Sequence, residues 1–198
     1  MERQAIERVV AANPNTIVVL NTGAPVTMDW LDRVPAVIQA WYPGQAGGDA
    51  LADVLFGDYN PGGRLPITFY QSTNDLPPLE EYAMEGRTYR YFQGEPLFAF
   101  GHGLSYTTFE LDNLRLEPDR VPVGAEVTLH VDVTNSGTLA GDEVVQVYIR
   151  HPEATVPRPL KELKGFKRIS LQPGERKMVT FVLHTHQLGY YDQAMRYA

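Results

Sequence analysis

Carboxylates are the first candidates for chemistry in this sequence, which has 24 aspartate and glutamate residues and no cysteine. The lack of cysteine excludes a thiol nucleophile, a thiolate metal site and a disulfide scaffold. Paired carboxyl groups can supply general acid and base catalysis. The acids that cluster are Glu80, Glu81 and Glu85, and Asp49 with Asp53. Adjacent acids on a turn are usually solvated, and acids in a first helical turn interact with its dipole, so we assign neither group to catalysis.

Histidine spacing predicts no metal site. His102 lies between Gly101 and Gly103, which predicts a backbone turn there rather than a ligand position. His184 and His186 alternate in a strand-like stretch and are predicted to share one face, but two ligands do not close a structural zinc site. The sequence also lacks the G-x-S-x-G and G-x-x-x-x-G-K patterns. We therefore expect no metal, no cofactor and no bound nucleotide.

A basic segment, residues 150–177, stands out in a chain whose net charge is −7. It contains eight Lys and Arg residues against three Asp and Glu residues. Its candidates for contact with an acidic surface are Arg158, Lys161, Lys164, Lys167 and Arg168. Because lysines also protect strand edges and no exposed aromatic pattern accompanies these residues, we favour a solvated sandwich face over polyanion binding. The negative net charge likewise disfavours nucleic acid as a partner.

Polar and aromatic residues follow two apolar stretches in the first half of the chain, residues 16–20 and 36–41. These residues are Asn21, Thr22 and Gly23 after the first stretch, and Tyr42 and Gln45 after the second. Ligands of open α/β sheets bind at the carboxyl ends of the strands, so these five residues are the predicted substrate-binding positions. Glycine in such a loop also serves a tight turn. The neighbouring Trp41 is interpreted as a core residue in preference to a ligand-stacking platform.

Alternating helices and strands are predicted to position these residues. The expected elements are helices over 2–12, 28–33 and 49–56 and strands over 16–20 and 36–41. The strands are continuously apolar, which is typical of parallel strands covered on both faces. Two strands do not make a stable sheet alone, so residues 1–70 are interpreted as the end of a larger α/β domain whose earlier strands precede Met1. An unpaired sheet edge there predicts oligomerisation or aggregation.

The rest of the chain has a different composition. Residues 71–104 are rich in aromatic side chains and are predicted to form an ordered strap whose rings are buried. From 105 to 198, alternating stretches such as 127–133, 144–149 and 177–183 indicate an all-β sandwich. No stretch approaches the roughly 18 apolar residues of a membrane span, and the N-terminus has no apolar signal core. We expect no membrane partner and leave the compartment open.

Five stretches, in this order, resemble the C-terminal part of glycoside hydrolase family 3, which contains β-glucosidases and β-xylosidases. They are Thr16 to Pro25 (TIVVLNTGAP), Ala40 to Leu65 (AWYPGQAGGDALADVLFGDYNPGGRL), Tyr89 to Thr107 (YRYFQGEPLFAFGHGLSYT), Val131 to Gly141 (VDVTNSGTLAG) and Lys161 to Gly174 (KELKGFKRISLQPG). The likeness covers nearly the whole chain. It implies a partial α/β sandwich, with a parallel sheet and helices, followed by an all-β sandwich of the fibronectin type III or immunoglobulin-like kind.

The resemblance implies three parts: residues 1–70 end the α/β domain, 71–104 form the strap, and 105–198 form the sandwich without its last strand. It also implies a retaining mechanism, in which one carboxylate attacks the anomeric carbon and a second protonates the leaving oxygen. The family places the nucleophilic Asp in a barrel domain and the acid/base Glu upstream of Met1, so no catalytic residue is assigned here. The chain alone is expected to be inactive, and to meet a β-linked saccharide only through that barrel. The choice between glucosyl and xylosyl units stays open.

A non-catalytic module is the alternative function. In this alternative the sandwich braces an enzyme core or binds polysaccharide or a partner surface, and buried strap rings favour bracing. Four tyrosines are too few and scattered to settle polysaccharide binding: Tyr148, Tyr190, Tyr191 and Tyr197. For Arg87, Tyr89 and Arg90 of the strap, ion pairing at a domain interface is favoured over contact with a substrate.

Overall fold

The computed structural model of the chain describes residues 2–197, which form two units. Unit 1 runs from the N-terminal helix through residue 59 and adds residues 66–88 and 92–100. Unit 2 consists of residues 60–65, 89–91 and the chain from 101 onward. Residues 71–104, which were predicted to form the strap and are called the aromatic segment below, therefore contribute residues to both units.

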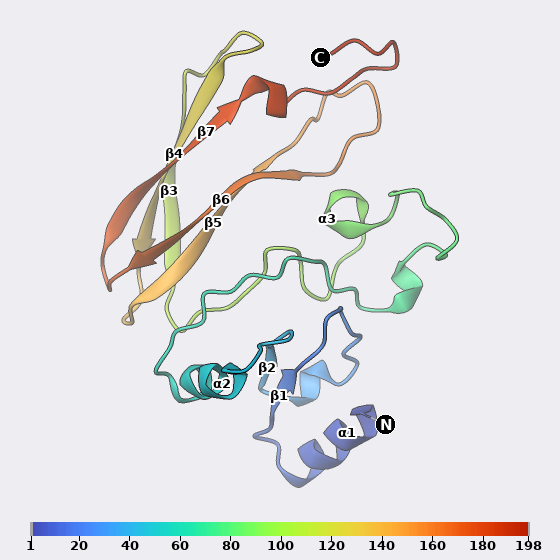
Figure 1. Cartoon of the computed structure of the whole chain (residues 1–198), viewed down its shortest axis with the longest axis vertical. Helices are drawn as coiled ribbons and strands as arrows, with labels where there is room; N and C mark the ends of the chain where they lie inside the picture. The colour runs from blue at the N-terminus through green and yellow to red at the C-terminus, as the bar shows by residue number, and fades with distance from the viewer. Residues whose placement is uncertain (1, 198) are drawn as a thin grey trace. The chain divides into compact units, whose positions relative to one another are not determined.

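Unit 1 begins with an alternation of helices and strands. The elements are α1 (Glu2–Ala12), β1 (Ile17–Leu20), η1 (Leu31–Arg33), β2 (Ala36–Gln39) and α2 (Gly47–Phe56), seen in blue to cyan in Figure 1. β1 and β2 pair in parallel, with Ile17 opposite Ala36 and Leu20 opposite Gln39. The parallel sheet expected from the two apolar stretches is confirmed. α2 ends at Gly57, whose φ of 88° is the left-handed conformation that closes many helices.

The short helix predicted over 28–33 is confirmed only over Leu31–Arg33, as the 3-10 helix η1. Two other details predicted for these elements are wrong. The second strand stops at Gln39, because Trp41 has φ of 54° and lies outside the extended region. The strands are not covered on both faces within the described residues, since Ile17 is 47% exposed.

Phe69, which is 1% exposed, lies in the core of unit 1. Its backbone forms an antiparallel bridge with Phe98. Its ring stands edge-on to the rings of Phe98 and Trp41, with centroids 6.2 and 6.3 Å away. Tyr70 and Phe92 make a similar contact at 4.9 Å. The aromatic segment thus supplies packing that two four-residue strands lack, and the ring of Trp41 packs inward.

The aromatic segment is ordered but its rings are buried unevenly. It contains η2 (Thr73–Asp75) and α3 (Thr88–Tyr91). Phe92 and Phe98 are half-buried, whereas Tyr82 is 95% exposed. The prediction that the rings of this segment are buried is therefore wrong for Tyr82, which projects from a loop.

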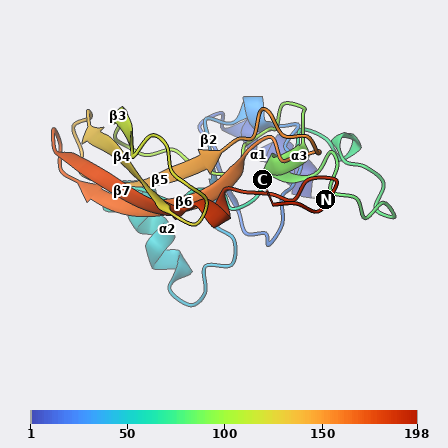
Figure 2. The same ribbon diagram turned by 90° about the horizontal axis from the view of Figure 1, so that it is seen from above.

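Unit 2 is an antiparallel sandwich, as the alternation predicted. Its strands are β3 (Phe109–Glu117), β4 (Glu126–Asn135), β5 (Gly141–Ile149), β6 (Glu162–Leu171) and β7 (Arg176–His184). One sheet has the order β3-β4-β7 and the other the order β5-β6. The strands can be followed from yellow-green to red in both views (Figure 1, Figure 2). Alternate residues of β4 are buried in the core, namely Val127, Leu129, Val131 and Val133.

Segments 60–65 and 101–104 lie side by side in unit 2. The Leu65 N–H donates to the His102 carbonyl at 2.8 Å, and the Gly101 N–H donates to the Leu65 carbonyl at 2.7 Å. Gly101 has φ of 83°, a conformation that favours glycine. The glycines around His102 therefore serve the backbone path.

His184 and His186 do not share one strand face, contrary to the sequence prediction. His184 ends β7, whereas His186 lies in η3 (Thr185–Gln187). Within residues 2–197 no group of three or more potential ligand side chains is arranged to hold a metal ion. In the same part of the chain, no helix combines the length and the apolar character that crossing a membrane requires.

Candidate functional site

The loops after β1 and β2 leave the small sheet at the same edge, because the strands are parallel and in register. These loops carry all five predicted binding residues: Asn21, Thr22, Gly23, Tyr42 and Gln45. Thr22 is half-buried and the other four are exposed. The local fold thus presents two neighbouring polar loops to solvent at the edge where α/β sheets bind ligands.

The ring of Tyr42 lies against Gly23. A Cβ atom at position 23 would come within 2.7 Å of Tyr42 Cε2 and 3.0 Å of the Tyr42 hydroxyl oxygen. Tyr42 is nevertheless 76% exposed. Glycine at position 23 therefore lets an aromatic ring approach the first loop closely while most of that ring stays open to solvent.

Gln39, at the end of β2, holds the loop that follows β1 through hydrogen bonds to Thr22. Its Nε2 donates to the Thr22 carbonyl at 2.9 Å and lies 3.4 Å from Thr22 Oγ1. Thr22 Oγ1 in turn donates to the Ala24 carbonyl at 3.0 Å. Gln39 was not among the residues predicted from the sequence, although a glutamine at the end of an otherwise apolar stretch was a usable signal. Its Oε1 is buried without a hydrogen-bond partner in the described structure.

The backbone at Trp41 turns the second loop. Its positive φ of 54° is uncommon for a bulky residue and costs of order 1–3 kcal/mol. As a result, the side chains of these two neighbouring residues lie in different environments. The ring of Trp41 packs on Phe69, whereas Tyr42 is exposed. Such outliers cluster at ligand-binding loops.

Asn21 and Gln45 complete the two loops without joining this network. Both residues are exposed, and the hydrogen bonds found in the described part of the chain do not involve their side chains. Their amide groups are therefore accessible to solvent or to a ligand. An exposed aromatic ring beside amide and hydroxyl groups can stack on and hydrogen-bond a polyhydroxylated ligand. The five positions themselves include no carboxylate, so they can supply binding groups but no acid or nucleophile.

Five of the carboxyl groups in the described part of the chain have a pKa clearly displaced from the ordinary value. In all five the pKa is lowered, which favours the charged form: Asp132, Asp142, Glu162, Glu175 and Asp192. A general acid in sugar hydrolysis needs the opposite, a raised pKa. These groups are therefore poor candidates for proton donation.

Glu162 is the buried carboxylate among them, with a side chain 8% exposed. Its two oxygens meet Arg90 at 2.8 Å, Lys164 at 3.1 Å and Arg158 at 3.3 Å. Burial raises the pKa of Glu162, but the hydrogen bond and charge of Lys164 and the charges of Arg158 and Arg90 outweigh burial, so the net shift is downward. Through its ion pair with Arg90, this carboxylate links α3 to β6. Both of its oxygens are engaged by cations, so neither is available for catalysis.

Replacing Glu162 by glutamine is expected to destabilise the chain by about 1.5–3 kcal/mol at pH 7, because charge-assisted hydrogen bonds are lost. A folded pKa below the ordinary 4.5 means that the ionised group stabilises the fold above about pH 4.5, and that this contribution disappears as pH falls through the folded pKa. Urea unfolding of both proteins between pH 7 and pH 3 measures the difference. A difference that stays constant over this range would contradict the assignment.

Arg87, Tyr89 and Arg90 act within the protein. The guanidinium of Arg87 donates to the carbonyls of Pro78 and Glu81, both at 2.8 Å, and so holds its own loop. The Tyr89 hydroxyl accepts the backbone N–H of Leu163 at 3.1 Å. With the ion pair of Arg90, these contacts leave structural roles for all three residues, which agrees with the favoured interpretation of Arg90 as an ion-pairing group.

The basic residues of segment 150–177 are also engaged internally. Arg158 and Lys164 meet Glu162, Arg168 Nε donates to Asp142 at 2.7 Å, and Lys167 donates to the Thr180 carbonyl. The Lys161 ammonium lies 4.8 Å from the centre of the Tyr148 ring. All five cations therefore have partners within unit 2, and three of them are neutralised by carboxylates, which disfavours a polyanion-binding surface.

Most of the chain is similar in sequence to known protein domains. A sequence model described as the glycosyl hydrolase family 3 C-terminal domain matches residues 1–106, and one described as a fibronectin type III-like domain matches residues 143–198. A probable beta-glucosidase I of Aspergillus terreus is 46% identical over 91% of this chain. A xylan 1,4-beta-xylosidase of Xylanibacter ruminicola is 42% identical over 97% of it. The chain spans only 24% and 22% of these two relatives.

Solved structures of larger beta-glucosidases are similar to this chain over nearly its whole length. A beta-glucosidase from Streptomyces venezuelae, crystallised in complex with D-glucose, superposes with a TM-score of 0.88 at 40% identity, over 100% of this chain and 27% of that one. A beta-glucosidase from Kluyveromyces marxianus superposes with a TM-score of 0.86 at 37% identity, over 98% and 25%. The sheet-and-helix part and the sandwich thus occur together in both of these larger proteins.

Proposed function

We propose that this chain, which belongs to glycosyl hydrolase family 3, is the C-terminal part of a retaining, exo-acting β-glycosidase that releases terminal β-D-glucosyl or β-D-xylosyl residues. The observation that carries the proposal is the match of nearly the whole chain to about a quarter of proteins named as a beta-glucosidase and a xylan beta-xylosidase. The chain contributes ligand-binding loops and a bracing sandwich, while the catalytic carboxylates belong to another part of the protein.

The chemistry supports this division of labour. Retaining hydrolysis needs two carboxyl groups about 5–5.5 Å apart, one as nucleophile and one as acid and then base. The buried carboxylate Glu162 is neutralised by three cations, and the five proposed binding positions include no carboxylate. We therefore assign the pair on which covalent catalysis and proton transfer depend to a part of the protein outside residues 2–197.

Hydrolysis of aryl β-D-glucoside and aryl β-D-xyloside provides the test. The 198-residue chain is expected to show no turnover, and a protein in which these residues follow a family 3 catalytic barrel is expected to cleave one or both substrates with retention. Turnover by the purified short chain, free of contaminating enzyme, would overturn the proposal. Inactivity of the longer protein on both substrates, when correctly folded, would count equally against it.

Tyr42 is proposed to contact the saccharide in the whole enzyme. Tyr42→Ala is expected to raise KM by about 2- to 10-fold, which corresponds to about 0.5–1.5 kcal/mol of lost ring contact. Tyr42→Phe should retain most of that contact, and Phe56→Ala, which removes a ring that is 85% exposed at the end of α2, is the matched control. Equal KM values for the Tyr42→Ala and Phe56→Ala variants would contradict a binding role.

A bracing module is the second candidate function, and it is compatible with the first. Tyr89 and Arg90 of the aromatic segment are anchored on β6 of the sandwich through Leu163 and Glu162. Polysaccharide binding by the sandwich is less well supported, because its tyrosines are engaged in contacts within the unit. Tyr190 packs with His151 and Arg158, and Tyr191 with Tyr197.

A further inference from the structure

Tyr190 holds the loop between β5 and β6, residues 150–161, against the segment that follows η3. The ring of His151 stands edge-on to the Tyr190 ring, with the centroids 5.5 Å apart. The Arg158 guanidinium lies 5.2 Å from the centre of the same ring, and the Thr155 N–H donates to the Tyr190 hydroxyl at 3.3 Å. Three residues of one loop therefore converge on a single tyrosine side chain.

The position of His151 favours its neutral form. Its Nε2 atom is buried and has no hydrogen-bond partner in the described structure. A protonated imidazole carries an N–H on both ring nitrogens, so the charged ring would bury a donor that has no acceptor. Burial is also the largest reason why the pKa of His151 lies below the ordinary 6.5. The closed loop therefore accommodates an uncharged imidazole better than an imidazolium.

The charges around His151 act mainly in the same direction. The charged groups that influence it are Arg158 of the loop and Glu162 and Lys164 of β6. The two cations lower the pKa of His151, whereas Glu162 raises it. Glu162 is already paired with three cations, so it offers little compensation to a further positive charge. From the segment after η3, the group that packs on His151 is the uncharged phenol of Tyr190.

We propose that the loop 150–161 is an acid-sensitive latch, which Tyr190 holds closed at neutral pH and which opens when His151 takes up a proton from solvent. The imidazolium is repelled by Arg158, and its Nε2–H finds an acceptor in water once the ring has left Tyr190. In the open loop His151 is solvated and titrates near 6.5. The latch is therefore closed above about pH 6.5 and opens progressively as the pH falls below it. This inference does not rest on the proposed glycosidase function.

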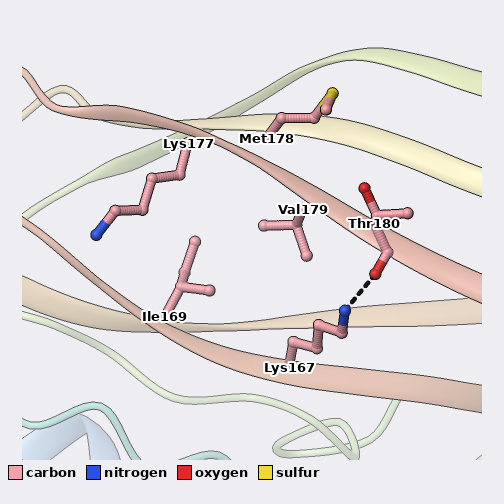
Figure 3. Close-up of a pocket in the computed structure, with 6 residues that line it drawn as sticks. All are labelled: Lys167, Ile169, Lys177, Met178, Val179 and Thr180. Carbon is pink, nitrogen blue, oxygen red and sulfur yellow. Dashed lines mark hydrogen bonds between the residues drawn. The ribbon is translucent and has the colours of Figure 1, made fainter.

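The edge of the sandwich formed by β6 and β7 is held by lysines instead. There Lys167 of β6 donates to the Thr180 carbonyl of β7, and Lys177 of β7 donates to a carbonyl of β6 at 2.6 Å. Figure 3 shows both lysines with Val179 and Ile169 between them. Lysine side chains keep their charge below neutral pH. Opening of the latch is therefore expected to leave this edge closed, and its amides serve as an internal control.

Amide hydrogen exchange of the full 198-residue chain at pH 7 and pH 5 tests the proposal. The protection factor of the Thr155 amide compares its exchange rate with that of an unstructured peptide at the same pH, and so reports how often the loop opens. We expect it to be about 10- to 25-fold lower at pH 5, because a group that protonates only in the open loop favours opening about tenfold per pH unit below 6.5. Glu162 stays ionised over this range, since its pKa lies below the ordinary 4.5. Protected amides of β7 should not change.

Matched variants identify the titrating group. His151→Phe keeps a ring against Tyr190 but takes up no proton, so it should abolish the difference between pH 7 and pH 5. His186→Phe is the control, because His186 also lies beside a tyrosine ring, that of Tyr197 at 5.9 Å, but is exposed. Its pH dependence should equal that of the parent chain.

Circular dichroism at pH 7 verifies that the variants fold, and His151→Leu takes the place of His151→Phe if the larger ring is not accommodated. The proposal is overturned by a protection factor of Thr155 in the parent chain that does not change with pH. Equal pH dependence in the His151 and His186 variants, or an equal loss of protection in β7, would overturn it as well.

Discussion

Replacing Asn135 by leucine is expected to lower the free energy of unfolding of unit 2 by about 3–5 kcal/mol. Asn135 ends β4 and is fully buried. Its Oδ1 accepts from Thr107 Oγ1 at 2.7 Å and from the Gly137 N–H at 3.1 Å, and its Nδ2 donates to the carbonyls of Leu139 at 2.8 Å and Leu171 at 3.1 Å. Leucine fills a similar volume but leaves four polar groups without this partner, two of them on the buried residues Thr107 and Leu171.

Urea unfolding monitored by circular dichroism measures the loss at Asn135. Asn135→Asp keeps the acceptor but turns an oxygen toward two carbonyls, so it should also destabilise. Ser136→Ala is the control, because this neighbouring exposed side chain should change stability by no more than about 0.5 kcal/mol. Equal unfolding midpoints for the Asn135→Leu and Ser136→Ala variants would show that the network does not stabilise the sandwich.

Replacing Gly103 by alanine is the second substitution with a large expected effect, a loss of about 3 kcal/mol or more. A Cβ atom at this position would lie 2.2 Å from the backbone carbonyl oxygen of Gly63 and 3.0 Å from Arg64. A backbone atom cannot move aside as a flexible side chain can. The two segments must then separate, which strains the ion pair between Arg64 and Glu143 at 2.8 Å.

Gly63→Ala is the matched control for Gly103→Ala, because a Cβ at position 63 meets nothing within 4 Å. The two substitutions add the same methyl group to two facing segments of one unit. Their unfolding midpoints in urea are expected to differ clearly, with Gly63→Ala close to the parent chain. A tolerated Gly103→Ala would mean that segments 60–65 and 101–104 do not approach each other this closely.

Both positions lie inside stretches by which the chain resembles its family, yet the structure gives each a packing role. Asn135 closes the end of β4, and Gly103 permits two backbone segments to touch. The stretches that identify the family therefore include positions that serve packing. The saccharide-binding groups that we propose lie elsewhere, in the loops after β1 and β2 with Tyr42 and Thr22.

The sequence alone determined the elements that follow from local patterns. Continuous apolar runs predicted the parallel pair β1 and β2, because the segment between them is long enough for the crossover connection that parallel strands need. Alternation predicted β4, because side chains of a strand point to opposite faces. Five ordered stretches were enough to predict the family. These inferences needed only residues that are close in the chain.

The tertiary structure decided what depends on the path of the backbone between distant residues. No periodicity predicts that Tyr42 covers Gly23, that Gln39 holds Thr22, or that Trp41 takes a positive φ. Arg158 and Lys164 are close to Glu162 in the chain, but Arg90 lies 72 residues away from it, so no local spacing predicts that Arg90 joins them. Contacts of this kind are fixed by packing in three dimensions, and a sequence pattern carries no record of them.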